Sequence, residues 1–273
     1  MFDMLKPRRD SSRPSRAPAA YAEFQGDPQF ATTLARGLEL LRCFTPDRPV
    51  LSNREMSQLL DLPAPTVSRL AYTLIRMGYL AQDVAYGKYR LGSAVLSVGY
   101  PLLELFATMR QRARPLMEEL AQQTGGSLSI GIQDRLNMVR IEAVRSHRPT
   151  PYPVDIGTTN SLAGTALGRA YLVALSAEER QNILNLIRVK APAEWNRYGA
   201  SLLANLARYP DVGSCTSLGE VHPDVFAVAV PLGRIDRRAA AALTCSFHGR
   251  APEERYLLEE IGPKLLSLAR RLA

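Results

Sequence analysis

Between residues 31 and 62, apolar positions recur every three or four residues, which predicts two helices. In the first, Leu34, Leu38, Leu41 and Phe44 are expected to form one apolar face. The second is expected to begin at a capping box. This box pairs Ser52 with Glu55, and the apolar residues Leu51 and Met56 flank it as a hydrophobic staple. The helix is expected to end by Asp61 and Pro63.

The stretch "LPAPTVSRLAYTLIRMGYL", residues 62–80, predicts a third helix. Pro65 suits the first helical position, after Ala64 as a poor cap, and Gly78 suits a left-handed C-terminal cap. The expected apolar side contains Val67, Leu70, Ala71, Leu74 and Met77. The opposite side contains Pro65, Ser68, Arg69, Tyr72, Thr73 and Arg76, and no acid.

Residues 79–92 alternate and turn around Tyr86 and Gly87, which predicts a two-stranded hairpin. Three helices followed by a hairpin are typical of a winged helix-turn-helix. Residues 31–92 contain eight basic and five acidic residues, a net charge of +3. The cations on the third helix and at Lys88 and Arg90 of the hairpin favour phosphate contacts.

We therefore predict that this region binds double-stranded DNA, with the first turn of the third helix deepest in the major groove. As an alternative, three such helices can serve packing within the protein or bind another protein. The expected DNA-binding residues are Arg36, Ser52, Pro65, Thr66, Ser68, Arg69, Tyr72, Thr73, Arg76 and Lys88.

The remaining chain is divided by its composition and periodicity. Residues 1–29 are rich in Pro, Ser and Arg and predict a disordered basic tail, whose arginines can touch phosphates. Residues 30–92 form the DNA-binding domain, residues 93–108 a helical linker, and residues 109–273 a second domain. From 93 to 123 the spacing is helical, with Pro101 and Pro115 expected to break it into pieces.

The second domain mixes predicted strands and helices. Strands are expected at residues 127–134, 137–144, 225–232 and 239–247. A helix is expected within 161–176, after a glycine-containing loop, and another over 252–273. These elements predict a sheet with helices on its faces.

Composition limits the classes of function. The 273 residues suit two domains, and 46% hydrophobic residues allow a sizeable core. The net charge of +8 weakly favours polyanionic partners. Three cysteines, with no CxxC pair, fit a reducing cytosol, and the scattered histidines offer no metal-ligand spacing. With no long apolar run or signal core, we expect a cytoplasmic protein with no membrane span, metal or cofactor.

Several segments together resemble a known family. "TLARGLELLRCF", "LSNREMSQLLDLPAPTVSRLAYTLIRMGYL" and "YRLG" resemble the N-terminal domain of IclR-type transcriptional regulators. "RARPLMEELAQQTGGSLSIGI", "DIGTTNSLAGTALGRAYLVAL" and "EVHPDVFAVAVPL" extend the likeness over nearly the whole chain after the tail. The resemblance implies an α+β fold with an N-terminal winged helix-turn-helix, a helical linker and a C-terminal GAF-like α/β effector-binding domain. It also implies a bacterial repressor or activator, dimeric or tetrameric, that responds to a small organic acid or aromatic compound.

The resemblance further implies an effector pocket between the sheet and two loops. The residues it indicates are Thr165, Ala166, Cys215, Thr216, Ser217, Phe226, Thr244 and Ser246. Thr216 stands where members that bind keto acids often have an aspartate, which argues against a glyoxylate-like ligand. Hydroxyls with a phenyl ring suit a small aromatic acid, and "TSLGE" resembles regulators of hydroxybenzoate or protocatechuate breakdown. Ordinary packing is the alternative role for each residue.

Two other functions remain as alternatives. Cys215 and His222 invite a thiol-dependent enzyme, but the sequence identifies neither a base within reach nor an orienting group, so we expect no enzyme. The second domain can also be an assembly module that senses no ligand, although the polar residues of "CTSLGE" favour a binding loop.

Overall fold

The computed structural model describes residues 24, 26–83, 86–147, 152, 154–235 and 239–272. The chain forms two compact units that divide between Tyr100 and Pro101. Most of the expected tail, residues 1–23 and 25, lies outside the described residues.

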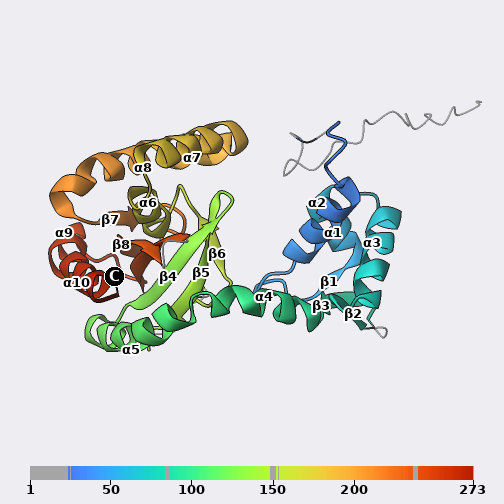
Figure 1. Cartoon of the computed structure of the whole chain (residues 1–273), viewed down its shortest axis with the longest axis horizontal. Helices are drawn as coiled ribbons and strands as arrows, with labels where there is room; N and C mark the ends of the chain where they lie inside the picture. The colour runs from blue at the N-terminus through green and yellow to red at the C-terminus, as the bar shows by residue number, and fades with distance from the viewer. Residues whose placement is uncertain are drawn as a thin grey trace, which may run out of the picture. The chain divides into compact units, whose positions relative to one another are not determined.

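The N-terminal unit contains α1 (Thr32–Arg42), α2 (Asn53–Leu60) and α3 (Ala64–Arg76), with short strands β1 (Leu51–Ser52), β2 (Leu80–Asp83) and β3 (Lys88–Leu91). The strands pair in the order β1-β3-β2, so the predicted hairpin gains an extra strand from the segment before α2 (Figure 1). The predicted winged helix-turn-helix is confirmed. The capping box is also present, since Glu55 N donates to Ser52 Oγ and Ser52 N donates to the Glu55 carboxylate.

Details of these helices differ from the prediction. Leu34 and Leu38 are 63% and 53% exposed, whereas Leu40 is fully buried and Phe44 is 8% exposed. The side of α1 that packs against the core is therefore centred nearer Leu40. The apolar face that the spacing predicted is displaced from it. Met77, predicted on the apolar side of the third helix, is 60% exposed because it lies beyond the last turn as the C-cap.

The start of α3 also differs in detail. Pro63 rather than Ala64 is the residue before the helix, so Pro65 occupies the second helical position. Gly78, with φ of +78°, follows the helix in the predicted left-handed conformation.

Two helices, α4 (Ala94–Glu104) and α5 (Ala107–Thr124), cover the predicted linker and the start of the second domain. Pro101 lies inside α4 and Pro115 inside α5, so the expected breaks at the prolines are wrong. The chain instead leaves helical conformation before α5, where the side chain of Phe106 is buried in the core of the second unit. Each proline removes one donor without ending its helix.

The C-terminal unit is built on an antiparallel sheet in the order β6-β5-β4-β9-β8-β7. Its strands are β4 (Ser127–Asp134), β5 (Asn137–Val144), β6 (Thr159–Ser161), β7 (Cys215–Leu218), β8 (Val225–Ile235) and β9 (Ala239–His248). Its further helices are α6 (Ala166–Val173), α7 (Ala177–Lys190), α8 (Pro192–Val212), α9 (Glu254–Tyr256), the π-helical turn η2 (Leu257–Ile261) and α10 (Gly262–Leu272).

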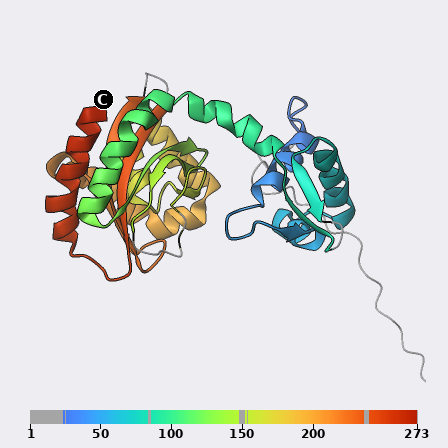
Figure 2. The same cartoon turned by 90° about the horizontal axis from the view of Figure 1, so that it is seen from below.

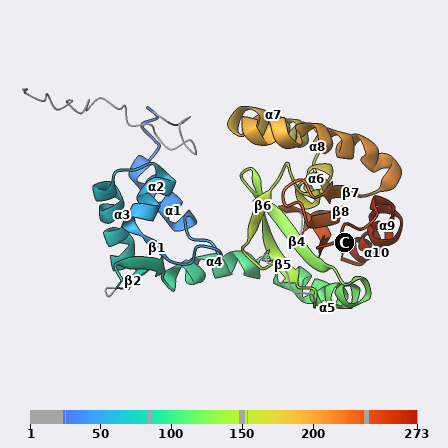
Figure 3. The ribbon, with the colours of Figure 1, turned by 180° about the vertical axis from the view of Figure 1, so that it is seen from behind.

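The two faces of this sheet bury separate apolar clusters. Leu128, Ile130 and Leu243 pack against α5, η2 and α10, and Figure 2 shows α5 and α10 side by side on this face. Ala229 and Ala242 pack against α6, α7 and α8, which cover the other face in Figure 3. We call these the α5/α10 face and the α6/α8 face. The predicted layers of helices on a sheet are confirmed.

Two ion pairs to one buried carboxylate attach α5 to the sheet. The side chain of Glu142 in β5 is 2% exposed, and it accepts from Arg110 Nε at 3.1 Å and from Arg114 Nη1 at 2.9 Å. Arg114 also pairs with Glu118, one turn further along α5. The helix that follows the linker is thus fixed to β5 by charge as well as by apolar packing.

Gly168 allows α6 to approach the preceding segment. A Cβ at this position would lie 2.0 Å from the backbone oxygen of Leu162. We expect Gly168→Ala to lower the free energy of unfolding of the C-terminal unit by about 1–3 kcal/mol, because the overlap involves backbone that must shift. Urea denaturation, followed by circular dichroism and by the fluorescence of the single tryptophan, Trp195 in α8, measures this.

The matched control is Gly37→Ala in α1, where no atom would lie within 4 Å of the added Cβ. This change should stabilise its helix by up to about 1 kcal/mol through helix propensity alone. Equal unfolding midpoints for Gly168→Ala and the unmodified protein would contradict the close approach.

Candidate functional site

The exposed side of α3 presents an acid-free surface. The side chains of Ser68, Arg69, Thr73 and Arg76 are exposed, and Tyr72 is 65% exposed. Val67 and Ala71 are fully buried on the other side and hold the helix against α1 and α2. Pro65 is exposed as well, and Thr66 is half-buried. The structure therefore gathers the predicted α3 residues on one accessible surface with hydroxyls, a phenol and two cations.

A second group lies at the start of α2. Ser52 pairs with Lys88 across β1 and β3, which brings these two predicted residues together. The Ser52 hydroxyl is engaged in the cap, donating to Glu55 at 2.7 Å. Hydrogen bonds from Ser52, with a contribution from Lys88, hold the pKa of Glu55 below its usual value. Asn53, which the sequence did not single out, donates from Nδ2 to Ser68 Oγ at 2.9 Å and links α2 to α3.

Arg36 lies apart from these groups, on α1. Its side chain is half-buried, and its Nε is buried without a hydrogen-bond partner among the described residues. Its expected DNA contact remains a prediction.

The predicted effector residues do not converge on one site. Cys215 and Ser217 pair with Ala229 and Ala227, so they lie on the α6/α8 face. Thr216 and Phe226 lie on the α5/α10 face, since Thr216 pairs with Val228 and Phe226 belongs to that cluster. Thr216 Oγ1 contacts Arg208 Nη2 at 2.9 Å and Glu254 Oε1 at 3.2 Å.

Thr244, Ser246, Thr165 and Ala166 lie on the α6/α8 side. Thr244 Oγ1 donates to Val228 O at 3.1 Å, and Ser246 Oγ donates to Ser127 O at 3.3 Å. Thr165 caps α6, accepting from Gly168 N at 3.2 Å and donating to Ser161 O at 2.7 Å. Ala166, the first residue of α6, is fully buried. The hydroxyls of Thr165, Thr244 and Ser246 are thus engaged with the chain's own backbone.

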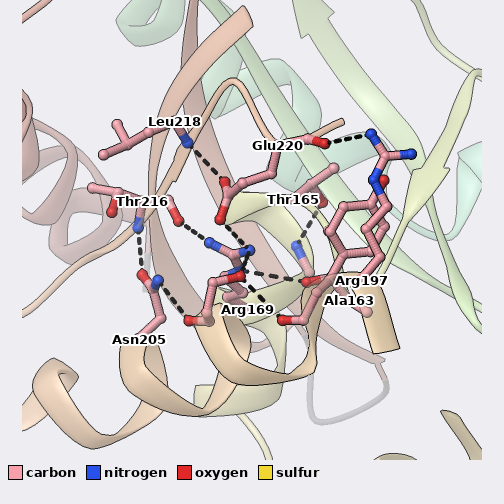
Figure 4. A network of polar contacts seen from close by, with 12 residues as sticks. Ala163, Thr165, Arg169, Arg197, Asn205, Thr216, Leu218 and Glu220 are labelled. Atoms are coloured by element: carbon pink, nitrogen blue, oxygen red, sulfur yellow. Dashed lines mark hydrogen bonds and ion pairs between the residues drawn. The ribbon is translucent and has the colours of Figure 1, made fainter. Parts of the chain in front are cut away.

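Arg169, which sequence reasoning missed, ties the two predicted loops together (Figure 4). Its side chain is 1% exposed and forms an ion pair with Glu220 at 2.8 Å. It also donates to Ala163 O, Thr216 O and Ser201 Oγ, which belong to segments far apart in the sequence. Glu220 in turn accepts from Leu218 N at 2.7 Å. The carboxylate that this arginine binds is supplied by the "CTSLGE" loop itself.

A cavity of about 290 Å³ lies at the end of the sheet where β4 begins and β9 ends. Ser246 is the predicted effector residue that lines it. Its walls include the hydroxyls of Ser127 and Ser146, the rings of Tyr152, Phe247, His248 and Tyr256, and the cation of Arg250. Such a mixture of apolar rings and a few polar groups is typical of small-molecule sites.

Asp224 fixes two of these rings. Tyr152 Oη donates to Asp224 Oδ1 at 2.9 Å, and His248 Nε2 lies 2.6 Å from Asp224 Oδ2. The Tyr152 hydrogen bond is the largest cause that holds the pKa of Asp224 below its usual value. The ring of His222 packs against the ring of Tyr152 at an interplanar angle of 33°, with ring centroids 4.1 Å apart. No sequence signal indicated that Asp224 and His248 would meet across β8 and β9.

The thiol of Cys215 is poorly suited to catalysis. It is fully buried, and burial raises its pKa to about 12, so it stays protonated near neutrality. His222, the partner that the sequence suggested, packs against the ring of Tyr152 instead. The described residues contain no cluster of three or more metal-ligating side chains. None of the described helices combines the length and apolar character that a membrane crossing needs.

Comparison with known proteins agrees with this architecture. The IclR helix-turn-helix domain profile matches residues 33–84, and the profile of the C-terminal part of bacterial IclR transcriptional regulators matches residues 106–273. The HTH-type transcriptional regulator TsaQ1/TsaQ2 of Comamonas testosteroni is 35% identical over 207 residues, 74% of this chain and 73% of that protein.

Two further proteins extend the comparison. The p-hydroxybenzoate hydroxylase transcriptional activator of Acinetobacter baylyi is 25% identical over 88% of this chain and 89% of its own length. The crystal structure of an IclR family regulator from Brucella abortus is 39% identical, with a TM-score of 0.77, covering 90% of this chain and 92% of that one. The chain therefore belongs to the IclR family of transcriptional regulators.

Proposed function

We propose that this IclR regulator acts in the cytoplasm as a homodimer or homotetramer. It binds operator DNA through α3 and the β2–β3 wing, and it responds to a small aromatic acid in its C-terminal unit. The observation that carries the DNA-binding part is the exposed, acid-free side of α3. Hydroxyls and guanidinium groups can donate to base edges and phosphates, and no carboxylate on this helix repels the backbone of the duplex.

The cavity beside Ser246 supports the effector part. Its rings can cover an aromatic ligand, and its hydroxyls and the cation of Arg250 can receive a carboxylate. A similar protein is named as the activator of p-hydroxybenzoate hydroxylase, which supports an aromatic acid as the ligand class.

Apolar side chains on α4 support self-association. No residue of α4 is buried, and Leu96, Val98, Tyr100 and Leu102 are each 47% exposed or more. A second copy of the chain can cover this surface, and two joined reading heads supply the specificity that one short half-site lacks.

The role of α3 is tested with Arg69→Ala. We expect it to weaken binding to a DNA fragment selected by the protein from random sequence by about 1–3 kcal/mol, because a contact to a base edge or phosphate is lost. Fluorescence anisotropy titration measures this. Arg42→Ala on α1, which removes an ion pair with Glu39, is the control and should bind like the unmodified protein. Unchanged affinity in a folded Arg69→Ala protein would exclude Arg69 from the interface.

Self-association is tested with Val98→Glu combined with Leu102→Glu, one helical turn apart on α4. Burying two carboxylates without partners is costly, so we expect the assembly to dissociate at micromolar concentration. Light scattering measures the mass, with exposed Ser97→Glu as the control. An unmodified protein that is monomeric with and without DNA would rule out the proposed assembly.

The effector response is tested by calorimetric titration of 4-hydroxybenzoate and protocatechuate into the protein with and without bound DNA. Linkage requires that the acid change DNA affinity, and DNA change acid affinity, by one shared factor, typically about 5–150-fold. Ser246→Ala should weaken binding of the acid by about 1 kcal/mol, the contribution of one lost hydrogen bond. Exposed Ser267→Ala in α10 is the control. Identical acid affinity with and without DNA would favour an assembly module.

A further inference from the structure

Arg140 in β5 is a buried cation that meets only neutral oxygens. It is 7% exposed. Its Nε donates to Ser129 Oγ at 3.1 Å and its Nη1 to Thr158 Oγ1 at 2.7 Å. With the Asn160 amide turned so that its oxygen faces the guanidinium, Nη1 donates to that oxygen at 3.2 Å, and Nη2 donates to it too. No carboxylate of the described residues forms an ion pair with Arg140.

The charge around Arg140 is unbalanced. Asp155 attracts Arg140 electrostatically without a hydrogen bond to it. The Asp155 carboxylate is instead bound by both Nε and Nη2 of Arg145. One carboxylate thus serves two guanidinium groups. Burial lowers the pKa of Arg140 to about 10, which still leaves it charged near neutrality.

Arg169 has the carboxylate partner that Arg140 lacks. Arg169 is similarly buried on the same face of the sheet, and it has Glu220 at 2.8 Å as well as neutral oxygens. A buried charge without a counter-ion costs several kcal/mol, so buried guanidinium groups are normally paired. Arg140 therefore carries a buried charge that no carboxylate of the described residues neutralises, and its Nε, Nη1 and Nη2 meet neutral oxygens alone.

The surroundings of Arg140 adjoin the cavity. Ser129 follows Ser127, a cavity residue, on the same face of β4. Thr158 lies in the segment that contains Val154, another cavity residue, and this segment is bonded to β5, with Arg140 N donating to Thr158 O at 3.1 Å. The strand and the segment that surround the guanidinium thus also form part of the cavity wall.

We propose that Arg140 binds the carboxylate of the acid effector. This inference rests on the proposed function and names the residue that recognises the charged end of the ligand. A carboxylate matches the planar guanidinium with two parallel hydrogen bonds, and it neutralises the buried charge, which the neutral oxygens of Thr158 and Asn160 cannot do. Because Thr158 and Asn160 belong to the segment before α6, binding also reaches the loop that begins that helix.

The experiment compares each acid with its neutral isostere. Calorimetry on the full-length protein uses benzoate, 4-hydroxybenzoate and protocatechuate, each beside its primary amide. We expect the unmodified protein to prefer the acid about tenfold or more, because a hydrogen bond between two charged groups is stronger than one to a neutral group. Arg140→Met should lower acid affinity to that of the amide and leave amide affinity nearly unchanged. Arg140→Lys, which keeps the charge, should retain part of the preference.

Arg250→Met separates the two arginines near the cavity. If this variant removes the acid preference and Arg140→Met keeps it, Arg250 binds the carboxylate and the proposal for Arg140 is overturned. Equal affinity of the unmodified protein for acid and amide also overturns it, although the sensing function stands. If Arg140→Met does not fold by circular dichroism, a loss of acid affinity without loss of amide affinity in Arg140→Lys supports the proposal, and an unchanged ratio overturns it. No binding of any acid by a protein that still binds DNA contradicts the proposed sensing itself.

Discussion

The buried contact between Arg169 and Glu220 organises the C-terminal unit around α6. Through this one side chain, the turn before α6, the edge strand β7 and helix α8 are fixed to each other, although they lie up to about fifty residues apart in the chain. Because a guanidinium has five donors in a rigid plane, it can fix several segments at defined angles where an apolar contact would allow sliding. The cap at Thr165 and the close approach at Gly168 both depend on α6 staying in this position.

The N-terminal unit could be predicted almost completely because its signals are local. The cap at Ser52, the glycine after α3 and the turn at Gly87 each act within a few residues, and the structure contains all three. The prediction for this unit was wrong about which side of α1 faces the core. Leu34 and Leu38 satisfy the helical spacing, yet the core lies on the side of Leu40, and only the packing of α1 against α3 determines this.

The effector site was harder to predict for a related reason. Alternation along a strand tells which residues share a face, but both faces of this sheet are covered by helices, so both are apolar. Alternation separates Thr216 from Cys215 and Ser217, but the strand pairing is needed to tell which layer each side faces and that Phe226 of β8 shares the side of Thr216. Arg140, Arg169 and Asp224 escaped notice because their partners lie far away in sequence. The capping box at Ser176 and Glu179, which begins α7, was a local signal that could have been used.

The pairing of β4 with β5 contains an irregularity between Ile130 and Gly131. Ile130 is opposite Glu142 and Gly131 is opposite Arg140, so Ile141 is an extra residue. In a regular strand Arg140 and Glu142 would point the same way, but here one faces Ser129 and the other faces α5. A deletion of a single codon at Ile141 would restore the regular pleat. Arg140 and Glu142 would then be adjacent and would still face opposite layers, because neighbouring residues of a strand alternate. The irregularity thus adds one buried side chain, Ile141, to the core of the α5/α10 face without moving either charge to the other layer.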